Sequence, residues 1–508
     1  MKMKFRHLFC LILLLLAVTL ITCACKKPED NDDDTPGDEF SGSLSGGNGG
    51  GGETEAPKDE GDQNTTYEIN NADDLMNMKR KGKYVLKANI DMTGKEWKPV
   101  GTYEAPFVGS FDGNGYKITG LSVTKATEDV GVSAAFKYSY CGLFGYASGA
   151  QIKNVTIENA QITISETAQN RNIYAGVLGG RFYNCTLTDI TVSGTVSVVS
   201  SNHSAYAGGI VGGIFKTTAE RCVSTASVKT DRCPVDAHSG GLFAVVKDGS
   251  KVSYSYATGD VYASSTTGLA YAGGLFGYCF TTEVTNCYSA SKVYAEVSSS
   301  AMEEGKKGAA YSGGLAAIAS SIPLEGENEG DDPINTCVFL RSYYIGSEVS
   351  ANGGANSAYS GGLVAKSDYV TFKDCYCRAA LKAESDTDEA SVAGISTVST
   401  IYTRIDGCFY VGDMTVNART NALATVGTIS EQTPSDISKV ITSSAYSPSN
   451  SCIINGTKYT CVTENKEKIK LNGASKASST FSDITSLAEA LGWNASEWKM
   501  ENSLPIPV

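Results

Sequence analysis

Residue types that carry out enzymatic chemistry are scarce in this chain. The sequence has 508 residues but three histidines, and of these only His203 and His238 lie beyond the first 22 residues. We expect both to be surface turn residues, because each sits in a polar stretch before a Gly pair. No HExxH, GxSxG, P-loop or dinucleotide-binding motif occurs. The sequence therefore predicts no catalytic residue, no cofactor and no enzyme.

The 15 cysteines lack the spacing of a metal site. No Cys-x-x-Cys pair occurs, and Cys375 and Cys377 are separated by a single residue, so we expect no metal. An exported protein could oxidise its cysteines. We instead expect small buried thiols, because six of them fall at what looks like one repeated position: Cys185, Cys222, Cys287, Cys337, Cys375 and Cys408.

Paired carboxylates would be needed for glycoside hydrolysis, about 5–10 Å apart. Asp91 and Asp112 are the candidates. Asp112 begins the run Asp-Gly-Asn-Gly, however, which is typical of a tight turn. Ser, Thr and Tyr dominate the outward positions of the repeats, and this disfavours a cleft-type active site. A polysaccharide lyase or glycosidase stays open as one alternative function, and a passive structural surface protein as another.

Tyrosine is the residue type best suited to a binding surface, and the chain has 27. If successive repeats align, tyrosines at equivalent positions form ladders, and an exposed ladder could stack on sugar rings or contact a protein. A ladder that only stabilises the fold is the alternative, and we favour it, most strongly for the group that precedes the Gly pairs: Tyr174, Tyr206, Tyr271, Tyr311 and Tyr359. The candidate ligand-binding residues follow the Asn-Cys positions: Tyr254, Tyr256, Tyr288, Tyr344, Tyr376 and Tyr410.

A repeat must position these side chains. A glycine before an apolar run recurs about every 33 residues, with two longer steps: Gly142, Gly176, Gly209, Gly241, Gly274, Gly314, Gly362, Gly394 and, in degenerate form, Gly427. Such a fixed period indicates stacked repeats. Three strand-like stretches can be distinguished in each repeat, and their residues alternate between inward and outward. The sequence predicts an all-β parallel β-helix, or β-solenoid, of about 8–9 rungs with three strands per rung.

Regions of different composition flank the repeats, which we place at residues 135–430. Residues 67–134 are expected to form an N-terminal capping region, with a short helix after Asn70 or Asn71. Residues 431–508 are expected to form a C-terminal capping region. There Trp493, Trp498 and Leu504 would pack onto the last repeat and close the core.

The N-terminal residues look like a targeting segment. Lys2, Lys4 and Arg6 precede a short apolar run, as in a secretory signal peptide, here residues 1–22. The following Leu-Ile-Thr-Cys-Ala-Cys resembles the lipobox of bacterial lipoproteins, so Cys23 or Cys25 is the expected lipidation site. Residues 23–66 are acidic and Gly-rich and are expected to form a disordered tether. This acidic run resembles the export tag of some Gram-negative surface lipoproteins.

The repeats also resemble those of GLUG-motif proteins. The copies are CGLFGYASGAQIKNVTI, GGLFGYCFTTEVTNCYS and GGLVAKSDYVTFKDCYC. The resemblance implies a lipid-anchored or secreted surface protein of a gut bacterium that acts in adhesion or binding, and the motif carries no catalytic residues. With the expected lipid anchor and export tag, we expect a location on the outer membrane and a host glycan or matrix protein as the partner. The net charge of −13 argues separately against a nucleic-acid partner.

Overall fold

The computed structural model describes residues 60–128, 137–166, 171–298, 308–322, 336–400, 402–430, 441–461 and 469–508. It is 59% strand and 6% helix, which confirms the all-β class. Within these ranges no helix has the length and apolarity to cross a membrane. The proposed signal peptide and tether, with Cys23 and Cys25, lie outside the described residues apart from the last few of the tether.

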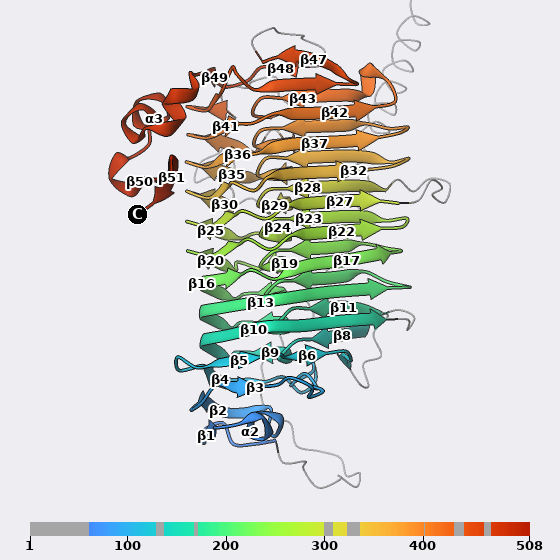
Figure 1. The fold of residues 1–508 in the computed structure, drawn as a ribbon, viewed down its shortest axis with the longest axis vertical. Coiled ribbons are helices and arrows are strands. Elements are labelled where there is room, and N and C mark those ends of the chain that lie inside the picture. The colour runs from blue at the N-terminus through green and yellow to red at the C-terminus, as the bar shows by residue number, and fades with distance from the viewer. Residues whose placement is uncertain are drawn as a thin grey trace, which may run out of the picture. The chain divides into compact units, whose positions relative to one another are not determined.

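Equivalent strands of successive repeats pair in parallel, side by side (Figure 1). Most belong to a 30-stranded sheet, here called sheet A, which three strand positions of each repeat enter in turn. The first position holds β1 (Thr66–Ile69), β2 (Lys81–Leu86), β4 (Val108–Asp112), β10 (Gln151–Glu166), β13 (Thr186–Ser200), β16 (Thr218–Ser224), β20 (Lys251–Ser253), β25 (Glu283–Thr285), β30 (Cys337–Leu340), β35 (Val370–Lys373), β40 (Arg404–Asp406) and β44 (Ile441–Thr442).

The long strands β10 and β13 run through all three positions, and β16 through the first two. The second position adds β3 (Ile90–Asp91), β5 (Lys117–Thr119), β21 (Tyr256–Ala257), β26 (Tyr288–Ser289), β31 (Tyr343–Tyr344), β36 (Tyr376–Arg378), β41 (Phe409–Val411), β45 (Ala445–Tyr446) and β49 (Ala474–Ser475). The third adds β6 (Ser122–Val123), β17 (Ser227–Cys233), β22 (Val261–Ser265), β27 (Val293–Val297), β32 (Glu348–Asn352), β37 (Ala380–Ser385), β42 (Met414–Ala418), β46 (Ser451–Ile454) and β47 (Thr457–Thr460).

Two further sheets complete the repeats. Sheet B has eight strands: β9 (Phe144–Ser148), β12 (Gly179–Tyr183), β15 (Val211–Phe215), β19 (Phe243–Lys247), β24 (Phe276–Phe280), β29 (Ala316–Ser320), β34 (Val364–Asp368) and β39 (Ser396–Ser399). Sheet C has eleven: β7 (Thr127–Glu128), β8 (Lys137–Cys141), β11 (Arg171–Ala175), β14 (Ala205–Gly208), β18 (Ala237–Gly240), β23 (Leu269–Gly273), β28 (Ala309–Gly313), β33 (Ser357–Gly361), β38 (Ala390–Ala393), β43 (Ala424–Gly427) and β48 (Ile469–Lys470).

One repeat, residues 269–297, thus contains five short strands, β23 to β27, rather than three. The stretch before the Gly pair, expected to be a turn, is a strand of sheet C. Phe243 and Phe276 stack inside the core at 6.2 Å. Glycine is required between sheets C and B, because a Cβ on Gly274 would clash with the carbonyl oxygen of Gly314 in the next repeat.

The N-terminal region continues sheet A, because β4 pairs in parallel with both β2 and β10. The expected helix is present as α2 (Ala72–Met76), and the Asn71 side chain caps it by accepting from the amides of Asp73 and Asp74 at 2.9 and 3.0 Å. A short 3-10 helix, η1 (Asn421–Leu423), precedes β43.

The C-terminal segment, residues 478–508, does not cover the end of the stack as the sequence predicted. It contains η3 (Ser478–Ser482), α3 (Ile484–Leu491), η4 (Ala495–Glu497) and the hairpin of β50 (Trp498–Glu501) and β51 (Leu504–Pro507). The segment lies beside sheet A, next to β36 and β41 (Figure 1). Trp493 Nε1 donates to the Gly407 carbonyl at 2.6 Å, well before the last strand of the sheet.

Candidate functional site

A ladder of tyrosines follows the second strand position of sheet A. Tyr256, Tyr288, Tyr343 and Tyr376 are in register, with ring centroids 4.6, 5.0 and 4.7 Å apart. Tyr256 and Tyr288 are half-buried. Tyr376 is fully buried because the C-terminal segment covers it, and its hydroxyl donates to the Pro505 carbonyl at 2.8 Å. The prediction of an accessible binding residue is therefore wrong for Tyr376.

Tyr344 and Tyr410 were also predicted to bind a ligand, and the structure corrects this. Both side chains are fully buried in the core, because they point to the opposite side of the sheet from the ladder. Their hydroxyls donate to the carbonyls of Ser291 and Ala379 at 2.6 and 3.0 Å. Tyr254 is 52% exposed at a turn and belongs to no stacked pair of the ladder.

The tyrosines before the Gly pairs form a second ladder in sheet C, and His238 is one of its members. Its ring stacks between Tyr206 and Tyr271 at 4.6 and 4.4 Å. Burial, with a smaller effect of Lys247, lowers the pKa of His238 to about 3. His238 is therefore a buried neutral residue of β18 rather than a surface turn residue, whereas His203 is half-buried in a bend.

Asp112 stabilises the tight turn that its sequence predicts. Its Oδ1 accepts from the Asn114 amide at 2.8 Å, and Asn114 has a φ of 50°. Asn154 Nδ2 also donates to it, at 3.0 Å, and Asp91 accepts from the Thr93 amide at 2.9 Å. The two backbone-amide hydrogen bonds use both carboxylates as turn-forming groups, and the Asn154 bond joins Asp112 to the adjacent strand β10.

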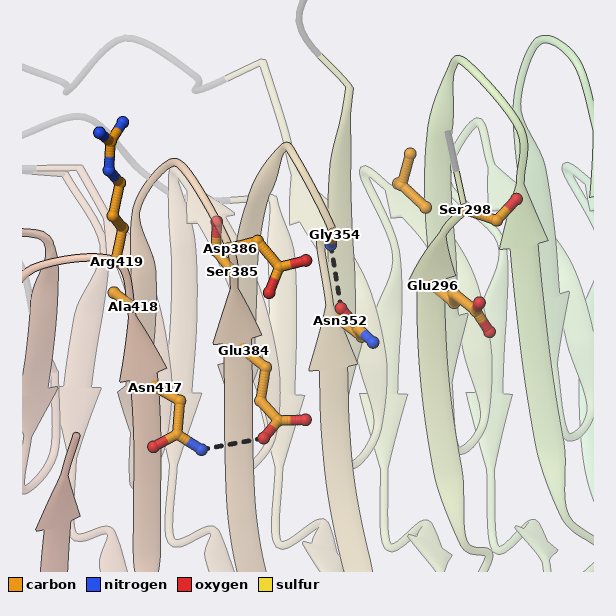
Figure 2. Close-up of a pocket in the computed structure, with 11 residues that line it drawn as sticks. Glu296, Ser298, Asn352, Gly354, Glu384, Ser385, Asp386, Asn417, Ala418 and Arg419 are labelled. Atoms are coloured by element: carbon orange, nitrogen blue, oxygen red, sulfur yellow. Dashed lines mark hydrogen bonds between the residues drawn. The ribbon is translucent and has the colours of Figure 1, made fainter. Parts of the chain in front are cut away.

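The candidate site is a polar trough that crosses the third strand position of sheet A (Figure 2). Glu296, Asn352, Glu384 and Asn417 occupy equivalent positions on β27, β32, β37 and β42, so their side chains leave the same face in adjacent strands. All four are half-buried. They line an open hollow of about 500 Å³, with Asp386 and Arg419 at its edge.

Hydrogen bonds fix the acceptor groups of the trough. Asn417 Nδ2 donates to Glu384 Oε1 at 2.9 Å, and the Gly354 amide donates to Asn352 Oδ1 at 2.9 Å (Figure 2). Lys382 Nζ lies 2.9 Å from Glu384 Oε2. Burial alone would raise the pKa of Glu384, but Lys382 and Asn417 outweigh it and lower the pKa. Glu384 is therefore an ionised acceptor.

Two tyrosines adjoin the trough on the same face. Tyr262 and Tyr294 stack with ring centroids 5.5 Å apart and are half-buried. Tyr294 precedes Glu296 by two residues, so period-two alternation places both outward. The Tyr262 hydroxyl donates to Glu296 Oε2 at 2.8 Å. Burial raises the pKa of both tyrosines, and the Glu296 carboxylate adds to it.

The trough and its two tyrosines were missed in the sequence. The signal was present in the stretch Val-Tyr-Ala-Glu-Val at 293–297, whose alternation puts Tyr294 and Glu296 on one face. The prediction that the outward positions lack carboxylates is wrong at Glu296 and Glu384. Across the described ranges, no His, Cys, Asp and Glu side chains cluster in threes or more in a way that could hold a metal ion.

Comparisons with known proteins do not place the chain in a family. No protein-family model and no curated protein matches the chain. A solved structure from Bacteroides ovatus, described as a candidate immunoglobulin A1 protease, aligns with a TM-score of 0.34 and 19% identity, over 87% of this chain and 92% of that one. An IgA1 protease aligns with a TM-score of 0.28 and 13% identity, over 78% of this chain and 22% of its own.

These neighbours correct one prediction. Both are named as proteases, and this contradicts the expectation that the chain is not an enzyme. With identities below 25% and TM-scores below 0.5, the likeness carries no argument about a reaction or substrate of this chain. The resemblance to GLUG-motif proteins stays a prediction.

Proposed function

We propose that this protein is a cell-surface binding or adhesion protein, anchored by a lipid at Cys23 or Cys25 in the outer membrane, and that its ligand is a glycan. The observation that carries the proposal is the juxtaposition of the stacked pair Tyr262–Tyr294 with the polar trough. An aromatic face beside fixed hydrogen-bond acceptors suits a molecule that is apolar on one face and rich in hydroxyls on its edges.

The charge of the trough narrows the class of glycan. Among the lining residues, Glu296, Glu384 and Asp386 are carboxylates and Arg419 is a cation. Lys382 pairs with Glu384, so three carboxylates face two cations and the trough keeps a net negative charge. Sugar hydroxyls can donate to ionised carboxylates and form charge-assisted hydrogen bonds. Acidic sugars would instead be repelled, since like charges in close contact are unfavourable. We therefore propose an uncharged glycan.

The scaffold in this proposal is a β-solenoid in which each repeat makes one turn and sheets A, B and C form its faces. The parallel registers support it, as do the eight strands of sheet B, which correspond to the expected 8–9 rungs. Such a stack holds equivalent side chains about 4.8 Å apart along one face. That spacing lets several repeats contribute to one extended ligand site.

A glycan array with residues 60–508 tests the function. We expect saturable binding to a neutral glycan. Tyr294→Ala should weaken it about three- to tenfold, because an aromatic contact contributes about 0.5–1.5 kcal/mol. Glu384→Gln should also weaken it by removing a charged acceptor. Tyr254→Ala is the matched control, since it removes an exposed tyrosine outside the trough, and should bind like the wild type.

Other outcomes of the same experiment would overturn the proposal. Binding only to host matrix proteins on the array would replace the glycan by a protein partner. If Tyr288→Ala weakened glycan binding and Tyr294→Ala did not, the binding site would lie at Tyr256 and Tyr288 of the tyrosine ladder. Shortened glycan after incubation would indicate the polysaccharide-active enzyme. Replacing Cys23 or Cys25 by Ala, followed by mass spectrometry of the N-terminal peptide, tests the lipid anchor.

A further inference from the structure

Two cysteines near the C-terminal end of sheet A face one another across a hairpin. Two other pairs, Cys279 with Cys337 and Cys375 with Cys408, join neighbouring repeats through their side chains. In the repeats, the thiols of Cys185, Cys287 and Cys408 donate to the backbone carbonyl two residues earlier, at 3.3 Å in each case. Cys452 and Cys461 instead face one another, with their Sγ atoms 2.8 Å apart. Both are buried and neither is in a disulfide.

The local fold brings this pair together. Asn455 and Gly456, with φ of 47° and 76°, form a two-residue turn between β46 and β47, as Asn-Gly favours in a hairpin. β46 pairs in parallel with β42 on one side and antiparallel with β47 on the other. The residues of β47 are largely exposed. Cys452 lies opposite Tyr459, so Cys461 is its diagonal neighbour across the hairpin.

We propose that Cys452 and Cys461 form a disulfide that locks the β46–β47 hairpin at the end of sheet A. The oxidising compartment that this needs rests on the proposed export of the protein. A disulfide here would hold β47 against β46. It would thereby keep the unpaired backbone groups of an edge strand from pairing with other chains.

The reaction is thiol–disulfide exchange with a disulfide-bearing oxidant, such as a dithiol oxidase of the export compartment. The Cys461 thiolate attacks one oxidant sulfur, forms a mixed disulfide and releases a thiolate. Cys452 then loses its proton and attacks Cys461 Sγ, which expels the second oxidant thiolate. Two electrons and two protons thus pass from the cysteines to the oxidant.

The environment supports Cys461 as the attacking group. Cys461 directly follows β47, whose residues are largely exposed, so opening of this strand frees its thiol first. Because both thiols are buried once the hairpin closes, the exchange takes place before closure or during a local opening of the exposed strand β47.

Peptide mapping tests the proposal on the full chain, once exported by cells and once refolded with oxidised glutathione. We expect a Cys452–Cys461 linkage in both samples and alkylated thiols at the other described cysteines. A reductant should lower the unfolding midpoint by about 2–4 °C. Cys461→Ser should abolish this reductant effect, whereas the control Cys185→Ser should keep it, because the Cys185 thiol donates to a backbone carbonyl.

Alkylation of both Cys452 and Cys461 after refolding with oxidised glutathione would overturn the proposal, as would linkage of either to another cysteine. Linkage in the refolded chain alone would support the pair and count against the proposed export. Linkage in both samples without glycan binding would count against the proposed function only, so the two failures can be told apart.

Discussion

At the scale of the residue, position relative to the sheet decides what a tyrosine can do. Neighbouring residues Tyr343 and Tyr344 point to opposite sides of β31, so one joins the outer ladder and the other fills the core. Tyr294, on another strand position, stands beside acceptors and is half-exposed. Since the residue type is the same in all three, the side of the strand and its cover determine the role.

Asp374 gives a prediction at this scale. Burial raises the pKa of its carboxyl to about 6, from an ordinary value of 3.8. The carboxylates of Asp406 and Glu497 add to this, while Lys373 and Arg341 oppose it. Because the pKa in the folded state is higher than in the unfolded state, ionisation of Asp374 costs stability. That cost should appear as the pH rises from about 4 to about 6.

We therefore expect the free energy of unfolding to fall by up to about 3 kcal/mol across this range. Asp374→Asn, which cannot ionise, should remove that part of the pH dependence and be more stable than the wild type at pH 7. Urea unfolding followed by tryptophan fluorescence measures it. Equal pH profiles for the two proteins would contradict the assigned role of Asp374.

At the scale of the element, the C-terminal segment acts as a cover for the tyrosine ladder. Trp493 and Trp498 stack at 4.1 Å and pack against Tyr376, and Phe481 stacks on Phe409 at 4.9 Å. This separate cluster lies outside the main core. The segment should therefore be able to leave without unfolding the repeats.

Truncation after residue 477 is expected to keep the far-UV circular dichroism of the sheets but to expose Tyr343, Tyr376 and Phe409, which should bind a hydrophobic dye.

Trp493→Ala should destabilise the segment by about 3 kcal/mol, since a buried aromatic side chain is lost. Limited proteolysis would show earlier cleavage within residues 478–508. Loss of the sheet signal on truncation would instead make the segment part of the folding core.

At the scale of the molecule, the repeats interact mainly with their neighbours, because each strand pairs with the equivalent strand before and after it. Stability in such an arrangement is close to a sum over repeats and their interfaces. A whole repeat should therefore be removable, whereas part of a repeat should not, since a partial deletion would pair unequal positions.

Deletion of residues 177–209, one step of 33, should give a folded protein that still binds the glycan, because it leaves Tyr262, Tyr294 and the trough in place. Deletion of residues 177–192 should give a chain that does not fold. Far-UV circular dichroism and glycan binding measure both. A folded partial deletion would show that the repeats tolerate slippage and would contradict the fixed register.

Local sequence was sufficient to predict the repeat, the all-β class and the turn at Asp112. These follow from local spacing and backbone preference, which a single chain carries in its order of residues. The cap of α2 by Asn71 is of the same kind.

The three-dimensional arrangement was needed to show which tyrosines face outward and that the C-terminal segment covers a side rather than an end. It was also needed to show that Glu296, Asn352, Glu384 and Asn417 share a trough. It also showed that Cys337 and Cys375 occupy different positions in their repeats, since Cys337 pairs with Val370 and Cys375 lies beside Cys408. The physical reason is that these contacts join residues about one repeat or more apart, and their register depends on insertions and on packing rather than on local sequence.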